Sequence, residues 1–187
     1  MQPILVAYAT TEGHTRKVAE FIAERLRIRG HRVDLVDVAG AGAQDVTAAY
    51  QAAFVGGSVH EHQHQKALLH FVKSHREWLA ALPVALFSVS LAASMDDIDS
   101  RLEARRMADE FVEASGLKPL LTRCVGGALK YTRYDYFKRL IMRMIARQQG
   151  HSVDTTQDHE YTDWDDVEAF VDEFLEAARI PGARRRA

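Results

Sequence analysis

The sequence predicts a single α/β domain in which a five-stranded parallel sheet lies between two layers of helices, as a three-layer sandwich. Short apolar runs alternate along the chain with longer segments whose apolar residues recur at helical spacing. This alternation is typical of a parallel sheet that helices cover on both faces. The length of 187 residues suits one domain. We place it at residues 1–180, with a helical insert at 130–161, and we assign 181–187 to a basic tail.

The first half of the chain supplies three of the predicted strands. Residues 4–8 form a short apolar run, which is typical of a strand that is buried on both faces. Residues 15–29 carry an apolar helical face, and Gly30 follows at the place of a C-cap glycine. The second and third strands are predicted at 33–38 and 53–57.

The second half continues as helix, strand, helix, strand and helix, at residues 66–81, 84–89, 98–115, 120–127 and 164–179. Pro83 follows the helix predicted at 66–81, and Gly116 ends the helix predicted at 98–115. Asp163 is the expected N-cap of the last helix. Only the segment 130–161 does not fit the alternation, and it carries a helix of its own at 134–148.

Composition and charge exclude several classes of function. The formal net charge of −2 gives no global signal for a polyanion such as a nucleic acid. Cys124 is the only cysteine, so no intrachain disulfide can form, which fits a reducing compartment. The apolar run at 4–8 is too short for a signal peptide, and no run of about 18 apolar residues predicts a spanning helix. We expect a cytoplasmic protein that is soluble or held at a membrane surface.

The turn after the first strand is the clearest candidate for a ligand site. Hydroxyl groups and free backbone N–H groups at a helix N-terminus bind anions, and Gly13 allows close approach of the backbone. The turn lacks the glycine pattern of a dinucleotide site and the lysine of a Walker loop. It therefore predicts a loop for one phosphate group, formed by Thr10, Thr11, Glu12, Gly13, His14 and Thr15. The alternative is that these residues only cap the helix.

This turn resembles the phosphate loop of the flavodoxin family, whose spacing is matched by Tyr8, Thr10, Gly13, Thr15, Ala19 and Ile22. The resemblance implies that the loop wraps the phosphate of flavin mononucleotide (FMN). Glu12 departs from it, because flavodoxins usually carry threonine there. A carboxylate would repel the phosphate, so we expect the Glu12 side chain to point to solvent.

In a flavodoxin fold the loops after the third and fourth strands flank the isoalloxazine ring, and the protein tunes the flavin through contacts with it. The resemblance thus implies ring contacts for Ser58, Val59, His60, Ser88, Val89, Ser90, Leu91 and Ala92, together with Gly127 after the fifth strand. An ordinary polar turn is the alternative for residues 88–93. Cys124, inside the fifth strand, is expected to be a buried, small apolar residue.

Three histidines follow the third strand at alternate positions. In an extended segment His60, His62 and His64 would share one face, which raises the question of a metal site. No Cys or Asp cluster accompanies them, so we predict no metal. We expect these side chains to line the flavin or substrate edge, or to be solvated.

The last third of the chain indicates which group of flavodoxin-like proteins the sequence resembles. The chain is similar to the flavodoxin-like, menaquinone-dependent protoporphyrinogen oxidases of heme biosynthesis in its segments Phe87-Ser88-Val89, Gly127-Ala128-Leu129-Lys130-Tyr131 and Tyr161-Thr162-Asp163-Trp164. The resemblance implies that protoporphyrinogen IX is oxidised to protoporphyrin IX, and that FMN passes the electrons to menaquinone or ubiquinone. The hydride step itself needs no general base, and we assign no catalytic residue.

Other functions stay open at this point. A flavodoxin-type electron carrier, an FMN-dependent quinone reductase and a flavin-free interaction domain are the alternatives. Electron carriers of this type tend to be strongly acidic, whereas this chain has a net charge of only −2. The oligomeric state is not predicted.

Residues 130–150 carry an excess of positive charge. Six basic residues stand against Asp135 alone, which gives +5 in a chain of net charge −2. We predict that its helix attaches to the anionic cytoplasmic leaflet or steers a substrate with two propionates, through Lys138, Arg139, Arg143 and Arg147. Three arginines of the tail, 184–186, are expected to assist. Alternatively, the helix packs on the domain and its charges are solvated.

Overall fold

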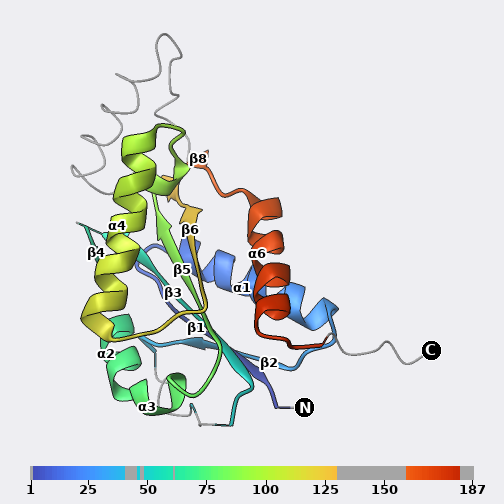
Figure 1. The fold of residues 1–187 in the computed structure, drawn as a ribbon. Coiled ribbons are helices and arrows are strands. Elements are labelled where there is room, and N and C mark those ends of the chain that lie inside the picture. The colour runs from blue at the N-terminus through green and yellow to red at the C-terminus, as the bar shows by residue number, and fades with distance from the viewer. Residues whose placement is uncertain (1, 41–45, 47–48, 61, 130–158, 182–187) are drawn as a thin grey trace.

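The computed structural model of the chain describes residues 2–40, 46, 49–60, 62–129 and 159–181 (Figure 1). The first half contains β1 (Ile4–Ala9), α1 (His14–Ile28), β2 (Val33–Asp37), β3 (Ala52–His60), β4 (Gln63–His64), α2 (Lys66–Ser74) and α3 (Arg76–Leu79). The second half contains β5 (Val84–Ser90), the short 3-10 helix η2 (Ala92–Ser94), α4 (Ile98–Ser115), β6 (Leu121–Gly126), β7 (Ala128–Leu129), β8 (His159–Glu160) and α6 (Trp164–Ala177).

The central sheet has the strand order β2-β1-β3-β5-β6, with all these neighbours parallel. The predicted five-stranded parallel sheet is therefore confirmed. The structure adds β4, which pairs antiparallel with the end of β3, and a separate antiparallel ladder of β7 and β8. The chain runs from β1 to β2 on one side of it, and then returns to form β3 on the other side. The strand order therefore reverses between β1 and β3.

Two helical layers cover the sheet, as expected (Figure 1). Every residue of β1 is buried, and alternate residues enter different cores. Ile4, Val6 and Tyr8 pack under α1 and α6, and the residues between them pack under α2, α3 and α4. This explains why the sequence of β1 is continuously apolar rather than alternating.

The helix predicted at 66–81 is in fact two helices. His75 leaves the helical region with φ −111° and ψ 15°, and its Nδ1 atom donates to the carbonyl oxygen of Phe71 at 2.8 Å. A side chain that bonds the preceding turn competes with the regular ladder, so α2 ends and α3 begins after it. The expected N-cap is confirmed, since the Asp163 carboxylate accepts a hydrogen bond from the Asp166 amide at 3.0 Å.

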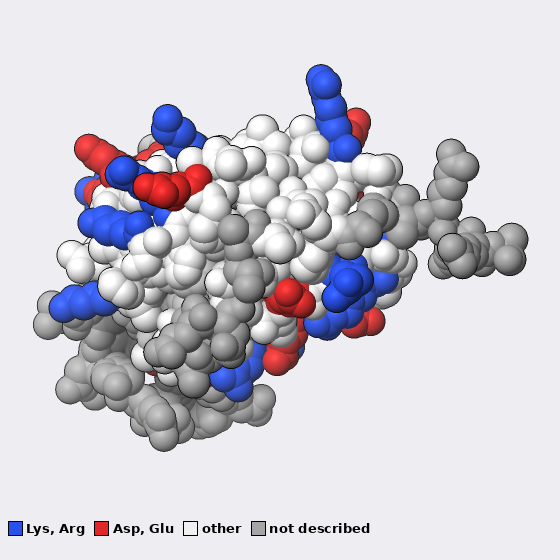
Figure 2. Space-filling view, turned by 90° about the horizontal axis from the view of Figure 1, so that it is seen from below, with Lys and Arg blue, Asp and Glu red and all other residues white. Residues whose placement is uncertain are grey.

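Ion pairs join α6 to the layers around it. Arg29 contacts Glu168 and Asp172, and Arg123 on the edge strand β6 contacts Asp166. On the face seen from below, basic side chains lie beside acidic ones rather than in a field of one sign (Figure 2). The helix predicted at 134–148, most of the insert and the basic tail lie outside the described residues, so the domain bounds stay a prediction.

Candidate functional site

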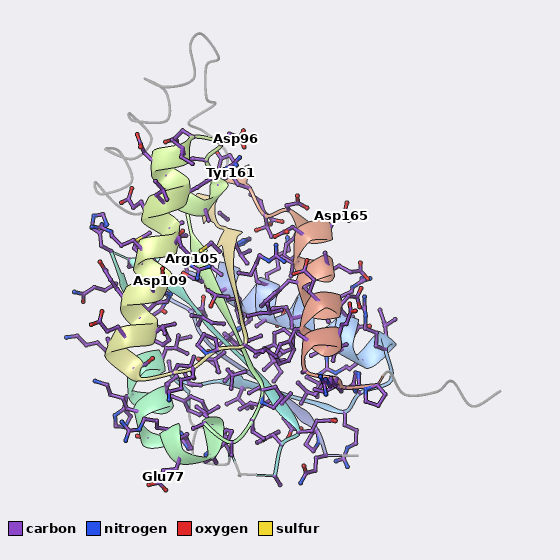
Figure 3. All side chains as sticks on the ribbon, in the orientation of Figure 1. Glu77, Asp96, Arg105, Asp109, Tyr161 and Asp165 are labelled. Atoms are coloured by element: carbon purple, nitrogen blue, oxygen red, sulfur yellow. The ribbon has the colours of Figure 1, made fainter. Side chains whose placement is uncertain are left out.

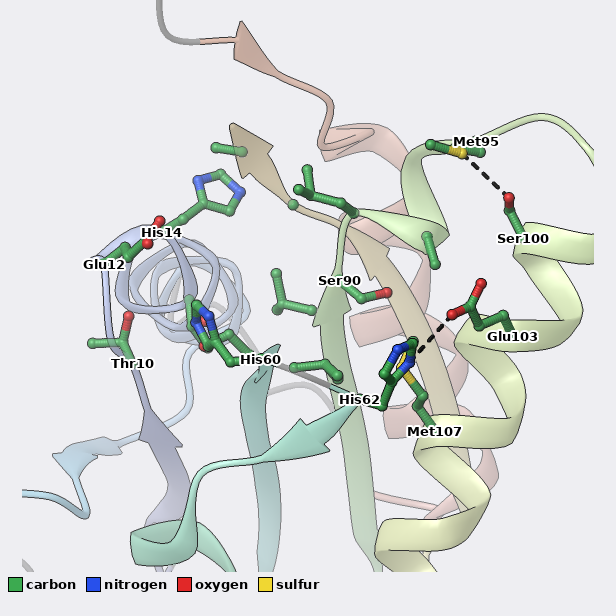
Figure 4. Close-up of a pocket in the computed structure, with 18 residues that line it drawn as sticks. Thr10, Glu12, His14, His60, His62, Ser90, Met95, Ser100, Glu103 and Met107 are labelled. Atoms are coloured by element: carbon green, nitrogen blue, oxygen red, sulfur yellow. Dashed lines mark hydrogen bonds and ion pairs between the residues drawn. The ribbon is translucent and has the colours of Figure 1, made fainter. Parts of the chain in front are cut away.

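An open cleft lies at the carboxyl ends of the parallel strands, where ligands bind in sheets of this kind. It encloses about 810 Å³, part of it open to solvent. Its walls come from the turns after β1, β3, β5 and β6 and from the facing side of α4 (Figure 4). The cleft thus lies beside the point between β1 and β3 at which the strand order reverses.

Most of the predicted cofactor residues meet in this cleft. Its wall includes Thr10, Glu12, His14, Thr15, Ser58, Val59, His60, Val89, Ser90, Leu91, Ala92 and Gly127. Three others lie off the wall: Thr11 and Gly13 are exposed, and Ser88 is buried beside His64. The structure brings together segments that are far apart in the sequence, while the role of each residue stays a prediction.

The turn after β1 has the geometry of an anion site. Gly13 is the N-cap of α1 with φ 89°, a conformation that glycine adopts without strain. Its amide donates to the Thr10 Oγ1 atom at 2.9 Å, which fixes the loop. The amides of the first helical turn have no intrahelical acceptors, so they can donate to an anion at the start of α1.

The Thr15 side chain supports a phosphate at this place. It is 1% exposed, and its Oγ1 atom has no hydrogen-bond partner within the described part of the chain. A buried hydroxyl without a partner is costly. A phosphate oxygen at the start of α1 would satisfy it, and therefore the residues present fit FMN.

The expectation for Glu12 is wrong. The side chain is half-buried and lines the cleft, and its Oε1 atom is buried. The left-handed turn at Gly13 directs the loop back over the start of α1, which keeps Glu12 at the cleft wall instead of in solvent (Figure 4). The carboxylate thus lies in the turn for which the sequence predicts a phosphate group.

Gln65 connects two of the loops and was not predicted from the sequence. Its Nε2 atom donates to Thr11 Oγ1 at 3.3 Å and also to Ser58 Oγ. A Cβ atom on Gly57 would come within 2.7 Å of Gln65 Oε1 and 2.9 Å of a Leu68 methyl carbon. Glycine at position 57 therefore allows Gln65 to bridge the turns after β1 and β3.

The histidines do not share one face, contrary to the expectation. The chain turns back between His60 and Gln63, and His62 occupies the turn with φ 65°. His60 and His62 line the cleft, whereas His64 does not. Within the described residues, no group of three His, Cys, Asp or Glu side chains lies close enough to hold a metal ion.

His64 is a structural residue next to the cleft. Its Nε2 atom lies 3.0 Å from Ser88 Oγ, and its ring centroid lies 4.7 Å from that of Phe111. Burial lowers the pKa of His64 to about 4, so the imidazole is neutral at neutral pH.

One wall of the cleft comes from α4 and the segment before it. Met95, Ser100, Glu103 and Met107 line it, together with His62. Glu103 Oε1 lies 3.3 Å from His62 Nδ1, and Ser100 Oγ donates to Met95 Sδ at 3.2 Å (Figure 4). The sequence marked 98–115 only as an amphipathic helix, and a helical period does not tell which residues of the half-buried flank meet a cavity.

Cys124 packs behind this wall. It contacts the small cluster of Ala92, Ala104 and Met107, and it is partly rather than fully buried. Burial raises the pKa of its thiol, so the side chain is a neutral thiol, as expected of a small apolar residue.

The Tyr-Thr-Asp-Trp segment lies between β8 and α6, and it contacts the ends of β6 and β7 next to the cleft; Figure 3 labels Tyr161. The Tyr161 amide donates to the Gly127 carbonyl oxygen at 3.0 Å. Glu160 accepts from Lys17 Nζ at 2.6 Å and from Trp164 Nε1 at 2.9 Å. The Lys17 hydrogen bond is the main cause of a lowered pKa at Glu160.

The predicted membrane or substrate contacts, Lys138, Arg139, Arg143 and Arg147, lie outside the described residues. Among the helices that the structure does describe, none is both long and apolar enough to cross a membrane.

Comparison with known proteins adds three likenesses. Residues 5–156 match the family model of the flavodoxin domain. The protoporphyrinogen IX dehydrogenase (quinone) of Leishmania major is 33% identical over 171 residues, which are 91% of this chain and 73% of that protein. The Escherichia coli (strain K12) protein of the same name is 28% identical over 177 residues, which are 95% of this chain and 97% of the relative.

A solved structure agrees with the fold. The structure of a short-chain flavodoxin associated with a non-canonical PDU bacterial microcompartment superposes with a TM-score of 0.57. The match covers 95% of this chain and 99% of that one at 13% identity. Together with the family match, it confirms the predicted fold class.

Proposed function

Because this chain belongs to the flavodoxin family and, within it, to the protoporphyrinogen IX dehydrogenases, we propose that it oxidises protoporphyrinogen IX and passes the electrons to a quinone. FMN is its cofactor and it is an oxidoreductase, as the sequence predicted. One observation carries the finer proposal. The likeness to the Escherichia coli relative of this name extends over 95% of this chain and 97% of the relative.

Protein groups in the cleft support this use of FMN. Bound FMN supplies hydride acceptance and two-electron transfer. The Thr10 turn and the buried Thr15 hydroxyl would hold its phosphate at the start of α1. The end of β3 and the turn after β5 would flank the ring, and they expose Val59, Leu91 and Ala92 to the cleft. These apolar surfaces exclude water from a flat aromatic group.

The stoichiometry of the proposed reaction follows from its chemistry. Conversion of protoporphyrinogen IX to protoporphyrin IX removes six electrons, so a two-electron flavin must cycle three times for each porphyrin. Menaquinone or ubiquinone would take up the electrons after each cycle. As part of this proposal, the reaction belongs to the late, tetrapyrrole-oxidising step of heme synthesis.

An anaerobic assay of the purified flavoprotein tests the proposal. Protoporphyrinogen IX and a menaquinone analogue are mixed with the protein, and porphyrin fluorescence is recorded together with the flavin absorbance. We expect one porphyrin for every three quinones reduced, with flavin bleaching when the quinone is omitted. If dithionite bleaches the flavin and protoporphyrinogen does not, the alternatives of an electron carrier or a different quinone reductase take its place.

Reversible attachment to the cytoplasmic face of the cell membrane is part of the same proposal. Its support is the sequence of residues 130–150, with a charge of +5 and an apolar stripe at helical spacing. A quinone dissolved in the bilayer is reached most directly by a flavoprotein that binds the membrane surface.

A further inference from the structure

The two ends of the cleft differ in chemistry (Figure 4). The end formed by the β1 turn and α1 presents the hydroxyl groups of Thr10 and Thr15. The opposite end is formed by α4 and the β3–β4 turn, and it presents thioethers and one carboxylate–imidazole pair. Since the phosphate of FMN fits the first end, the second end is left for the molecule that FMN oxidises.

The proposed reaction releases protons as well as hydrides. In each two-electron step, a C–H bond breaks at a carbon that joins two pyrrole rings, and the hydrogen passes to FMN with both bonding electrons. The cation that remains becomes neutral when a pyrrole N–H bond, or in the last step another acidic bond of the macrocycle, gives up its proton. An equal number of protons is taken up when the quinone is reduced. A proton acceptor at the substrate end would therefore accelerate the reaction.

We propose that Glu103 is this proton acceptor and that His62 relays the proton to solvent. This inference rests on the proposed function. The Glu103 side chain is 27% exposed and lines the cleft, while the His62 side chain is 55% exposed at its rim. Their facing atoms, Glu103 Oε1 and His62 Nδ1, are 3.3 Å apart. The pair thus forms a short path from the cleft interior to water.

The surroundings of Glu103 fit a macrocycle with inward N–H groups. A carboxylate only accepts hydrogen bonds when it is ionised, so it can pair with pyrrole N–H donors before it takes a proton, and a glutamine at this position would keep a carbonyl oxygen as acceptor for them. Met95 and Met107 line the same end. Thioethers are polarisable and favour contact with aromatic rings. His62 has a left-handed backbone with φ 65°, and its side chain contacts Glu103 on α4.

Other titratable groups of the cleft are less well placed. Glu12 and His14 belong to the phosphate end. His60 lies on the Thr10 side of the cleft, away from Glu103 (Figure 4). His64 does not line the cleft; it lies against Ser88.

Single-turnover reduction of the bound flavin by protoporphyrinogen IX, followed anaerobically at the flavin absorbance, tests Glu103. The variant Glu103→Gln keeps the size of the side chain and removes its basicity. We expect flavin reduction to slow about a hundredfold, within the range of general-base contributions. The matched control is Glu110→Gln, the same change on the exposed face of α4, where Glu110 pairs with Arg106.

Three further measurements separate proton transfer from a structural role. FMN content, binding of protoporphyrin IX by fluorescence, and reoxidation of dithionite-reduced flavin by the quinone should all stay within about twofold of the parent. In Glu103→Ala, added acetate should restore part of the rate of flavin reduction. His62→Gln, at an exposed turn, should slow flavin reduction about tenfold, and imidazole should restore part of it.

The outcomes are distinguishable. A parent protein that does not oxidise protoporphyrinogen defeats the proposed function, whatever the variants do. With an active parent, equal rates in Glu103→Gln and Glu110→Gln overturn the present inference and leave the function standing. Loss of protoporphyrin binding together with the rate also overturns it, because Glu103 would then serve binding. If Glu103→Gln does not retain FMN, the test rests on His62→Gln. An unchanged rate of flavin reduction in that variant overturns the proposed proton relay.

Discussion

His14 on the first turn of α1 donates a hydrogen bond from Nε2 to the Oγ1 atom of Thr162, at a distance of 2.7 Å. The direction follows from the next bond, since the Thr162 hydroxyl donates its only proton to the Gly126 carbonyl oxygen, also at 2.7 Å. The start of α1 is thereby tied to the end of β6 through the segment that leads into α6. A residue of the cleft wall and a residue 148 positions away are held together.

Replacement of Thr162 by valine removes both bonds and keeps the volume. Each hydrogen bond contributes about 0.5–1.5 kcal/mol, so the free energy of unfolding should fall by roughly 1–3 kcal/mol. Urea unfolding of the FMN-bound protein measures the change. Thr122→Val, a half-buried threonine of β6, is the matched control and should have a smaller effect. Equal effects of the two changes would show that the Thr162 bonds contribute no net stability.

Thr15→Val separates the cofactor from the fold. Without FMN, the variant should be as stable as the parent or more stable, because a buried hydroxyl without a partner is removed. FMN affinity should fall about tenfold or more, since a hydrogen bond to a charged group contributes about 1.5–3 kcal/mol. Fluorescence titration of the apoprotein with FMN measures the affinity. Thr122→Val, at a half-buried threonine of β6 off the cleft wall, is the control. An unchanged dissociation constant in Thr15→Val contradicts the assigned phosphate site.

His64 should make the protein less stable in acid. Its pKa is lowered from 6.5 to about 4 in the folded state, so the unfolded chain binds an additional proton between these values. Stability from this group is present above pH 6.5 and is lost as the pH falls toward 4. At about 1.4 kcal/mol for each pH unit, the loss is of the order of 3 kcal/mol.

Urea unfolding at pH 7 and at pH 4 measures this effect. The difference in unfolding free energy between parent and His64→Gln should shrink at pH 4 by up to about 3 kcal/mol. His70→Gln, which changes an exposed histidine of α2, is the control. A constant difference between parent and His64→Gln at both pH values would mean that His64 does not titrate in this way.

The basic residues of the insert allow a test of membrane attachment. Replacement of Arg139, Arg143 and Arg147 by glutamate should abolish sedimentation with anionic liposomes, since each basic residue near such a surface contributes about 1 kcal/mol. FMN should stay bound, and turnover with a lipophilic quinone should fall. The same three positions changed to lysine should sediment like the parent. If the glutamate variant still sediments at moderate salt, the membrane role of this segment is wrong.

Local patterns in the sequence predicted the elements that depend on neighbouring residues. The apolar run that became β1, followed by hydroxyl residues and Gly13, indicated a buried strand and an anion-binding turn because these signals lie within a few positions of one another. The same is true of Asp163, whose capping bond reaches only three residues along the chain. The break in the predicted helix 66–81 is equally local, but the bond from His75 to the Phe71 carbonyl oxygen that ends α2 has no distinct sequence pattern.

Only the tertiary structure decided what faces the cleft. The turn at His62 broke the expected common face of the three histidines and placed His62 opposite Glu103, which is 41 positions away on another element. Gln65 between two loops and Thr162 against His14 are contacts of the same kind. The sequence by itself determined the alternation of the five parallel strands with helices, and it predicted a phosphate turn after the first strand. The partners across the cleft depend on how separate elements pack. Local periodicity carries no information about contacts between residues that are far apart in the sequence.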